Sequence, residues 1–281
     1  MTSSSSAYVD TTILTDALLK WDTARDAALE ALQLYTETLL PDYAVREFQA
    51  GPLCNYVYAH NCFADKRTLD DVHAKVAALG PNPQRNKFLT ALGALSGARL
   101  ATLVEYERII EEREMAWMDG ERFRLRFIRT HLANKIFDAV AGIDTICTKR
   151  THPLPCLEKV QIEQDGEELR ATGKRMDRAK SAECGLTAHL RQQADALTKI
   201  LEATEEQNAA KPKPELLRRA DALRAVLEGG DVPRASCRGL GDAVFAALAP
   251  DGSTILTTNE QDHRPLADRV GKLVAAPVRK T

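Results

Sequence analysis

At both ends of the chain, the pattern of apolar and polar positions predicts strands and helices that alternate. Ala7 to Asp10 is a short apolar run that ends in an acid, and apolar positions at helical spacing follow at once from Ile13 to Leu18. This order predicts a strand and then a helix. Next we expect a helix, an extended segment and a helix that ends at a glycine–proline pair: 24–34, 38–41 and 42–50, before Gly51-Pro52.

The C-terminal end returns to this alternation. The pattern predicts an apolar helix opened by glycines, a turn, a buried strand, a helix and a last strand: 239–249, 250–253, 254–257, 262–270 and 272–276. Because both ends alternate strand and helix, we expect one parallel sheet assembled from the two end segments.

The middle of the chain follows a different pattern. Apolar residues three and four apart, with charged opposite faces, predict amphipathic helices over 70–79, 88–114, 120–146, 166–204 and 214–227. No run in this region reads convincingly as a strand. The sequence therefore predicts an α/β fold in which a core of residues 1–52 and 230–281 carries a large, mainly helical insertion of residues 53–229.

Composition narrows the function classes. The 281 residues are 44% hydrophobic and 28% charged with a net charge of −2, which is typical of a globular protein and argues against binding to a polyanion through bulk charge. No segment approaches the roughly 20 apolar residues of a membrane span, and the first residues lack the pattern of a signal peptide. We therefore expect a cytoplasmic protein with no membrane partner.

Acidic and amide side chains fall at the edges of the predicted elements. They are Asp10 after the first strand, Glu47, Asp242 at a helix start, and Asn259, Glu260 and Asp262 after a later strand. The carboxyl ends of parallel strands share one edge of a sheet, where carboxylates repel one another unless a hard cation such as Mg²⁺ or Mn²⁺ lies between them. The alternative to metal binding is helix capping, because Asp10 and Asp242 each stand where an N-cap would satisfy free backbone N–H groups.

These segments resemble the PIN-domain nucleases. Val9-Asp10-Thr-Thr-Ile-Leu is similar to the opening strand of that family with its first acid, and Val45-Arg-Glu47-Phe fits the second acid. Asp242-Ala-Val-Phe is similar to the helix of the third acid, and Ile255-Leu-Thr-Thr-Asn to the closing strand and turn. The stretch between Glu47 and Asp242 is far longer than in compact members of the family.

The resemblance implies a PIN-like core and a metal-dependent endonuclease that hydrolyses phosphodiester bonds, with RNA preferred over DNA as the substrate. It implies Mg²⁺ or Mn²⁺ as cofactor and acidic ligands at Asp10, Glu47, Asp242 and one of Glu260 and Asp262, with Thr11, Thr12 and Asn259 in support. Catalytic roles fall to Asp10, Glu47, Asp242 and Asp262. The alternatives are a non-catalytic PIN-like protein whose insertion binds a partner, and a DNA nuclease of a defence or repair system.

Two further groups carry candidate chemistry. Residues 122–150 hold seven basic and two acidic side chains, and Arg122, Arg126 and Arg129 share one helical face. This face is either a phosphate-binding surface or a solvated helix face, and the insertion could also carry a homodimer or partner interface. Cysteines and a histidine at 147, 152, 156 and 184 could hold zinc, although buried free thiols are the favoured interpretation.

Overall fold

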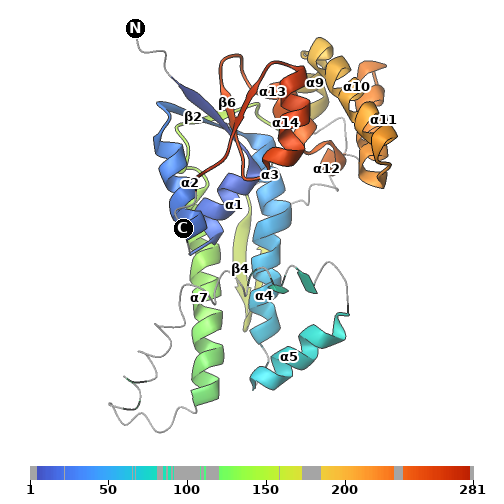
Figure 1. Cartoon of the computed structure of the whole chain (residues 1–281). Helices are drawn as coiled ribbons and strands as arrows, with labels where there is room; N and C mark the ends of the chain where they lie inside the picture. The colour runs from blue at the N-terminus through green and yellow to red at the C-terminus, as the bar shows by residue number, and fades with distance from the viewer. Residues whose placement is uncertain are drawn as a thin grey trace.

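A five-stranded parallel sheet lies at the centre of the protein (Figure 1). The computed structural model describes residues 5–21, 23–64, 66, 68–80, 85–86, 88–89, 91, 108, 111, 120–157, 159–172, 185–230 and 237–278. The order of the strands in the sheet is β3-β2-β1-β6-β7, and every neighbouring pair is parallel. The strands are β1 (Ser6–Val9), β2 (Glu37–Pro41), β3 (Lys149–Thr151), β6 (Thr254–Leu256) and β7 (Leu273–Ala275).

Strand β1 occupies the middle of the sheet and is buried on both faces. Tyr8 pairs with Leu39 of β2 on one side and with Ile255 of β6 on the other. Ala7, Tyr8 and Val9 are fully buried, as expected for a central parallel strand covered by helices on both sides. The predicted parallel sheet and the α/β class are thereby confirmed.

Helices from the two end segments flank this sheet (Figure 1). They are α1 (Thr11–Leu19), α2 (Thr23–Gln33), α3 (Asp42–Phe48), α12 (Cys237–Leu240), α13 (Asp242–Leu248) and α14 (Glu260–Arg269). Helices α1, α2, α3 and α14 fall close to their predicted ranges, whereas the single helix predicted over 239–249 is divided at Gly241 into α12 and α13. Their apolar sides are almost fully buried, as in α13, where all the residues after Asp242 are part of the hydrophobic core.

The predicted helix end at Gly51-Pro52 is wrong. The chain continues through a π-helical turn, η1 (Gln49–Leu53), directly into helix α4 (Cys54–Ala64), which the sequence did not predict. Seven of the eleven residues of α4 are buried, on more than one side of the helix. A helix buried on several sides has no apolar stripe at helical spacing, so the pattern that identifies an amphipathic helix is missing.

The middle of the chain supplies further helices. They are α5 (Leu69–Ala78), α7 (Gly120–Gly142), α9 (Leu186–Arg191), α10 (Ala194–Ala210) and α11 (Pro214–Leu227). Helices α5, α7 and α11 agree with their predicted ranges, whereas most of the helix predicted over 88–114 lies outside the described residues. Helices α4 and α7 pack together and extend away from the sheet, whereas α10 and α11 pack beside α13 and α14 (Figure 1).

The expectation that residues 53–229 contain no strand is also wrong. Strand β3 adds to the edge of the central sheet beside β2, so the sheet is not built from the two end segments alone. Thr38 and Thr148 join the two strands, because each side-chain hydroxyl accepts a 2.9 Å hydrogen bond from the other residue's backbone N–H. With only three residues, Lys-Arg-Thr, β3 is too short and too polar to show an apolar alternation.

A hairpin replaces the start of the helix predicted over 166–204. Strands β4 (Gln161–Asp165) and β5 (Glu168–Thr172) pair antiparallel, and Gly166 takes a φ of 60° in the turn between them. Glycine adopts this left-handed conformation without steric cost. The hairpin is fixed to α4 by Asn61, whose amide group exchanges two hydrogen bonds with the backbone of Leu169, at 2.8 and 2.9 Å.

No helix in the described part of the chain is long and apolar enough to cross a lipid bilayer.

Strand β3 should be essential to the stability of the sheet. Asp42 is 13% exposed and accepts hydrogen bonds from the Arg150 guanidinium and from the Leu154 backbone N–H. Asp42→Ala leaves both donors without this acceptor, and we expect a loss of about 1–3 kcal/mol in the free energy of unfolding. Chemical denaturation measures this loss. Asp138→Ala, an exposed change on α7, should stay within about 0.5 kcal/mol, and equal effects of the two variants would contradict the prediction.

Candidate active site

Asp10 lies at the end of the central strand and is 3% exposed. Its Oδ1 accepts a 2.6 Å hydrogen bond from the Thr11 backbone N–H, and its Oδ2 accepts 2.7 Å bonds from the hydroxyls of Thr12 and Thr257. Asp10 is therefore the N-cap of α1, as the helix-capping interpretation predicted. Burial alone would raise its pKa, but His263 and these two hydroxyls stabilise the charged form and hold the pKa below its usual value.

Asp242 is not an N-cap, so the interpretation of Asp242 as a helix-capping residue is wrong. The N-cap of α13 is Gly241, with a φ of 40°. The Tyr43 hydroxyl fixes this turn against α3: it donates to the Cys237 carbonyl at 2.9 Å and accepts from the Gly241 N–H at 3.1 Å. The Asp242 carboxylate is thereby free to make contacts away from its own helix.

Two cationic side chains contact the carboxylate of Asp242. Nε2 of His263 lies 3.1 Å from Oδ1, and an Nη2–H of Arg219 donates to Oδ2 at 3.1 Å. The same His263 nitrogen lies 3.5 Å from Oδ2 of Asp10. One buried imidazole on α14 therefore joins the ends of two elements that are distant in the sequence.

His263 carries a positive charge at neutral pH. Burial alone would lower the pKa of its imidazole, but the carboxylates of Asp10 and Asp242 outweigh burial and raise the pKa to about 10. Its other nitrogen, Nδ1, is buried and has no hydrogen-bond partner among the described residues.

Glu47 completes a group of three carboxylates. Its Oε2 accepts a 2.8 Å hydrogen bond from the Thr11 hydroxyl, one residue after Asp10. Burial and then the negative charges of Asp10 and Asp242 raise the pKa of Glu47 to about 7, and the Thr11 hydroxyl offsets this only in part. The carboxylates of Asp10, Glu47 and Asp242 are therefore close enough to repel one another.

The turn after β6 makes separate contacts. Asn259 donates to Asp262 at 2.7 Å, and Glu260 pairs with Arg264 at 3.1 Å. Within the described residues, no hydrogen bond or ion pair joins Glu260 or Asp262 to the three carboxylates. The side chain of this segment that reaches Asp10 is that of Thr257.

Sequence reasoning missed Thr257 and Arg219. Thr257 is the last residue of the strand predicted over 254–257, and Thr11 and Thr12 follow the first predicted strand closely. That placement at a strand end could have identified Thr257. Arg219 lies on α11, in the segment treated as an insertion, and is 13% exposed at its side chain. No local pattern distinguishes it from the other arginines of this amphipathic helix.

Carboxylate oxygens are the donors that Mg²⁺ and Mn²⁺ prefer, so the chemistry of Asp10, Glu47 and Asp242 fits a hard divalent cation. The repulsion of Glu47 by the charges of Asp10 and Asp242 also fits a bound divalent cation. Among the described residues, however, no three His, Cys, Asp or Glu side chains are arranged as a ready ligand set. His263 and Arg219 supply the positive charge beside Asp242 instead.

The residues considered for zinc make other contacts. His152 Nδ1 lies 3.0 Å from the hydroxyl of Tyr8, and burial raises the pKa of the Cys147 thiol to about 11. Cys147 and Cys156 are free cysteines, and Cys184 lies outside the described residues. A thiol with a raised pKa is a poor metal ligand, because zinc binds the thiolate.

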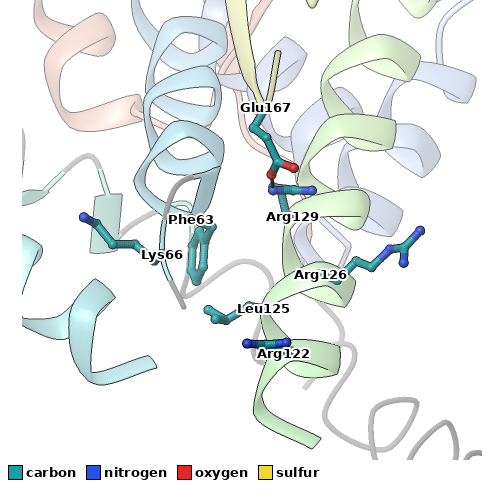
Figure 2. A pocket seen from close by; sticks show the side chains of 7 residues that line it. All are labelled: Phe63, Lys66, Arg122, Leu125, Arg126, Arg129 and Glu167. Carbon is teal, nitrogen blue, oxygen red and sulfur yellow. Dashed lines mark ion pairs between the residues drawn. The ribbon is translucent and has the colours of Figure 1, made fainter. Parts of the chain in front are cut away.

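The three arginines of the predicted face, Arg122, Arg126 and Arg129, lie on α7 and line a common pocket. In Figure 2 the Arg126 side chain points away from Phe63 and Lys66. The lining residues belong to the C-terminal end of α4, α7 and the β4–β5 turn. Helices α4 and α7, called the α4–α7 arm below, extend away from the sheet (Figure 1).

Comparison of the chain with protein-family models, with curated proteins and with solved structures found no match.

Burial of Glu47 and its repulsion by Asp10 and Asp242 should appear in the pH dependence of stability. The pKa of Glu47 is raised from 4.5 to about 7 in the folded protein, so the stability it contributes is present below pH 4.5 and is lost as the pH rises through 7. Glu47→Gln removes this loss. In metal-free buffer the variant should melt a few degrees higher than wild type at pH 8.

The difference in melting temperature between Glu47→Gln and wild type should shrink towards pH 5. A difference that does not change with pH would show that the pKa of Glu47 is not raised by burial beside these charges. Glu202→Gln, a change on the exposed side of α10, is the matched control and should show no pH-dependent difference.

Proposed function

We propose that this protein is a metal-dependent endonuclease with a PIN-like core, and that RNA rather than DNA is its substrate. The observation that carries the proposal is the group of three carboxylates, Asp10, Glu47 and Asp242, in which Glu47 has a pKa of about 7. The parallel sheet supports it, because ligands of such folds bind at the carboxyl ends of the strands, where Asp10 stands.

Asp10, Glu47 and Asp242 would hold one or two Mg²⁺ or Mn²⁺ ions. A bound divalent cation of this kind lowers the pKa of water and offsets the charge that develops on phosphate during hydrolysis. Glu260 and Asp262 stay candidates for a further acidic ligand, with Asn259 in support. Since the pKa of Glu47 lies near 7, cation binding at neutral pH should release protons from the site.

The remaining residues of the site position the carboxylates. The hydroxyls of Thr12 and Thr257 both fix Oδ2 of Asp10, and the Thr11 hydroxyl fixes Glu47. Arg219 and His263 hold the two oxygens of Asp242. Because α11 supplies Arg219, the helical segment 53–229 belongs to the architecture of the site as well as being an insertion in a PIN-like core.

We keep the cytoplasm as the expected location.

Cleavage of a labelled single-stranded RNA by the purified full chain tests this function. We expect cleavage with Mg²⁺ or Mn²⁺ and none in EDTA, because the carboxylates alone cannot neutralise a phosphodiester in attack. A matched DNA strand tests the preference for RNA. Asp10→Asn keeps the cap of α1, since Asn and Asp cap about equally well, and should lose cleavage. Undiminished cleavage in EDTA, or by Asp10→Asn, would contradict the proposal.

Binding of the cation can be measured without any substrate. Mn²⁺ should raise the melting temperature of the wild-type protein, and Asp242→Asn should reduce this shift because one of the three negative charges is lost. In metal-free buffer the same variant should be less stable by about 1–3 kcal/mol, since Arg219 and His263 lose a charged partner. Asp138→Asn on α7 should keep the wild-type shift.

If neither wild type nor Asp242→Asn responds to Mn²⁺, the carboxylates are not a metal site. The non-catalytic alternative, in which His263 and Arg219 permanently neutralise the acids and the helical insertion binds a partner, would then replace the nuclease.

A further inference from the structure

The pocket lined by Arg122, Arg126 and Arg129 has a volume of about 500 Å³ and lies between α4 and α7 (Figure 2). Its walls come from the C-terminal end of α4, from α7 and from the β4–β5 turn. The lining residues are Phe63, Lys66, Arg122, Leu125, Arg126, Arg129 and Glu167. Three of its four cations lie on α7 within about two turns of the helix, so the charge is concentrated on one wall.

The charge of this pocket is poorly balanced. Of the described residues that line it, four carry positive charge and one, Glu167, carries a carboxylate, which pairs with Arg129. Burial and the nearby positive charge of Arg126 lower the pKa of Arg129, so these like charges are close enough to disfavour one another. Arg122 and Arg126 are exposed at the surface of α7. A site of this kind favours a ligand that carries several negative charges.

The apolar lining selects the chemistry of that ligand further. Phe63 and Leu125 are only 3% and 5% exposed, so they form the floor of the pocket and present little surface for stacking with a base. The guanidinium groups instead offer forked donors that match phosphate oxygens. The pocket therefore suits the phosphate groups of a strand rather than its bases, and contacts of that kind carry no sequence preference.

We propose that this pocket binds the phosphate backbone of a nucleic-acid strand, as a second contact remote from the carboxylate site. The proposal rests on the proposed function, since it takes the strand to be the substrate. Helix α7 rises about 30 Å from Arg122 to Gly142, where Gly142 packs against Leu18 of α1. A strand stacked at about 3.4 Å per nucleotide would need on the order of nine nucleotides to reach from the pocket to the sheet.

Binding measured in EDTA separates the pocket from catalysis. The probes are a labelled single-stranded RNA of about 25 nucleotides and a DNA of the same sequence, titrated with the full chain at several salt concentrations. The test variant is Arg122→Gln/Arg126→Gln. We expect its Kd to rise by roughly tenfold and the slope of log Kd against log salt to fall by about one to two, since up to two phosphate contacts are lost.

The matched control is Arg124→Gln, which removes a positive charge from the same helix at an exposed residue outside the pocket lining. It should change Kd and the salt slope much less than the double variant does. Thermal melting of both variants shows whether they are folded, and Arg126→Gln alone provides a milder change if the double variant is unstable.

Substrate length gives a second readout. With Mg²⁺, the double variant should raise KM for the 25-nucleotide strand but leave KM for a strand of about five nucleotides unchanged, because only the long strand reaches both sites.

Each outcome decides one of the two proposals. If wild type cleaves the strand, and wild type and the double variant have equal Kd and equal slopes of log Kd against log salt, the pocket proposal is overturned and the nuclease proposal stands. Weakened binding of either probe by the double variant, without any cleavage by wild type, supports the pocket as a nucleic-acid site and overturns the nuclease. If the wild-type chain binds neither the RNA nor the DNA probe, the pocket proposal is overturned. Binding of an acidic protein in place of both probes overturns it as well.

Discussion

The contact of His263 with Asp10 and Asp242 is the interaction on which the arrangement of the site depends. Its single Nε2 lies within 3.5 Å of both carboxylates. Burying carboxylates costs free energy unless positive charge or hydrogen bonds compensate them, and the protonated imidazole supplies that charge from inside the core. Removing one partner of such a group would leave the others uncompensated, so the groups must be brought together by the fold as a unit.

Several elements depend on this constraint. The strand end of β1 supplies Asp10, the α12–α13 turn supplies Asp242, and α14 supplies His263. Arg219 adds α11 to the same network through the second oxygen of Asp242. The hydroxyls of Thr11 and Tyr43 stabilise the charged form of Glu47 on α3, but within the described residues no ion pair joins Glu47 to a cation. The unfavourable negative charge of the cluster is therefore concentrated at Glu47. That leftover repulsion is what an added cation would relieve.

The sequence predicted what local patterns can determine. The end strands and their helices follow from apolar runs and helical spacing, and Asp10 caps α1 as an acid after a strand should. It could not predict α4, which is buried on several sides, or β3, whose three polar residues join the sheet through Thr38 and Thr148. Nor could it pair Arg219 with Asp242, since that contact depends on how α11 packs against α12 and α13.

The near-neutral charge of the whole chain conceals two opposite local charges. The net charge of −2 argues against nucleic-acid binding only if charge is spread evenly. In the fold, acids gather at the end of the central strand, and cations gather in the pocket on the α4–α7 arm (Figure 2). A strand of phosphates is attracted to the cations but repelled by the acids. It can therefore bind along both sites only when positive charge also reaches Asp10, Glu47 and Asp242, which makes the two proposed sites dependent on one another during substrate binding.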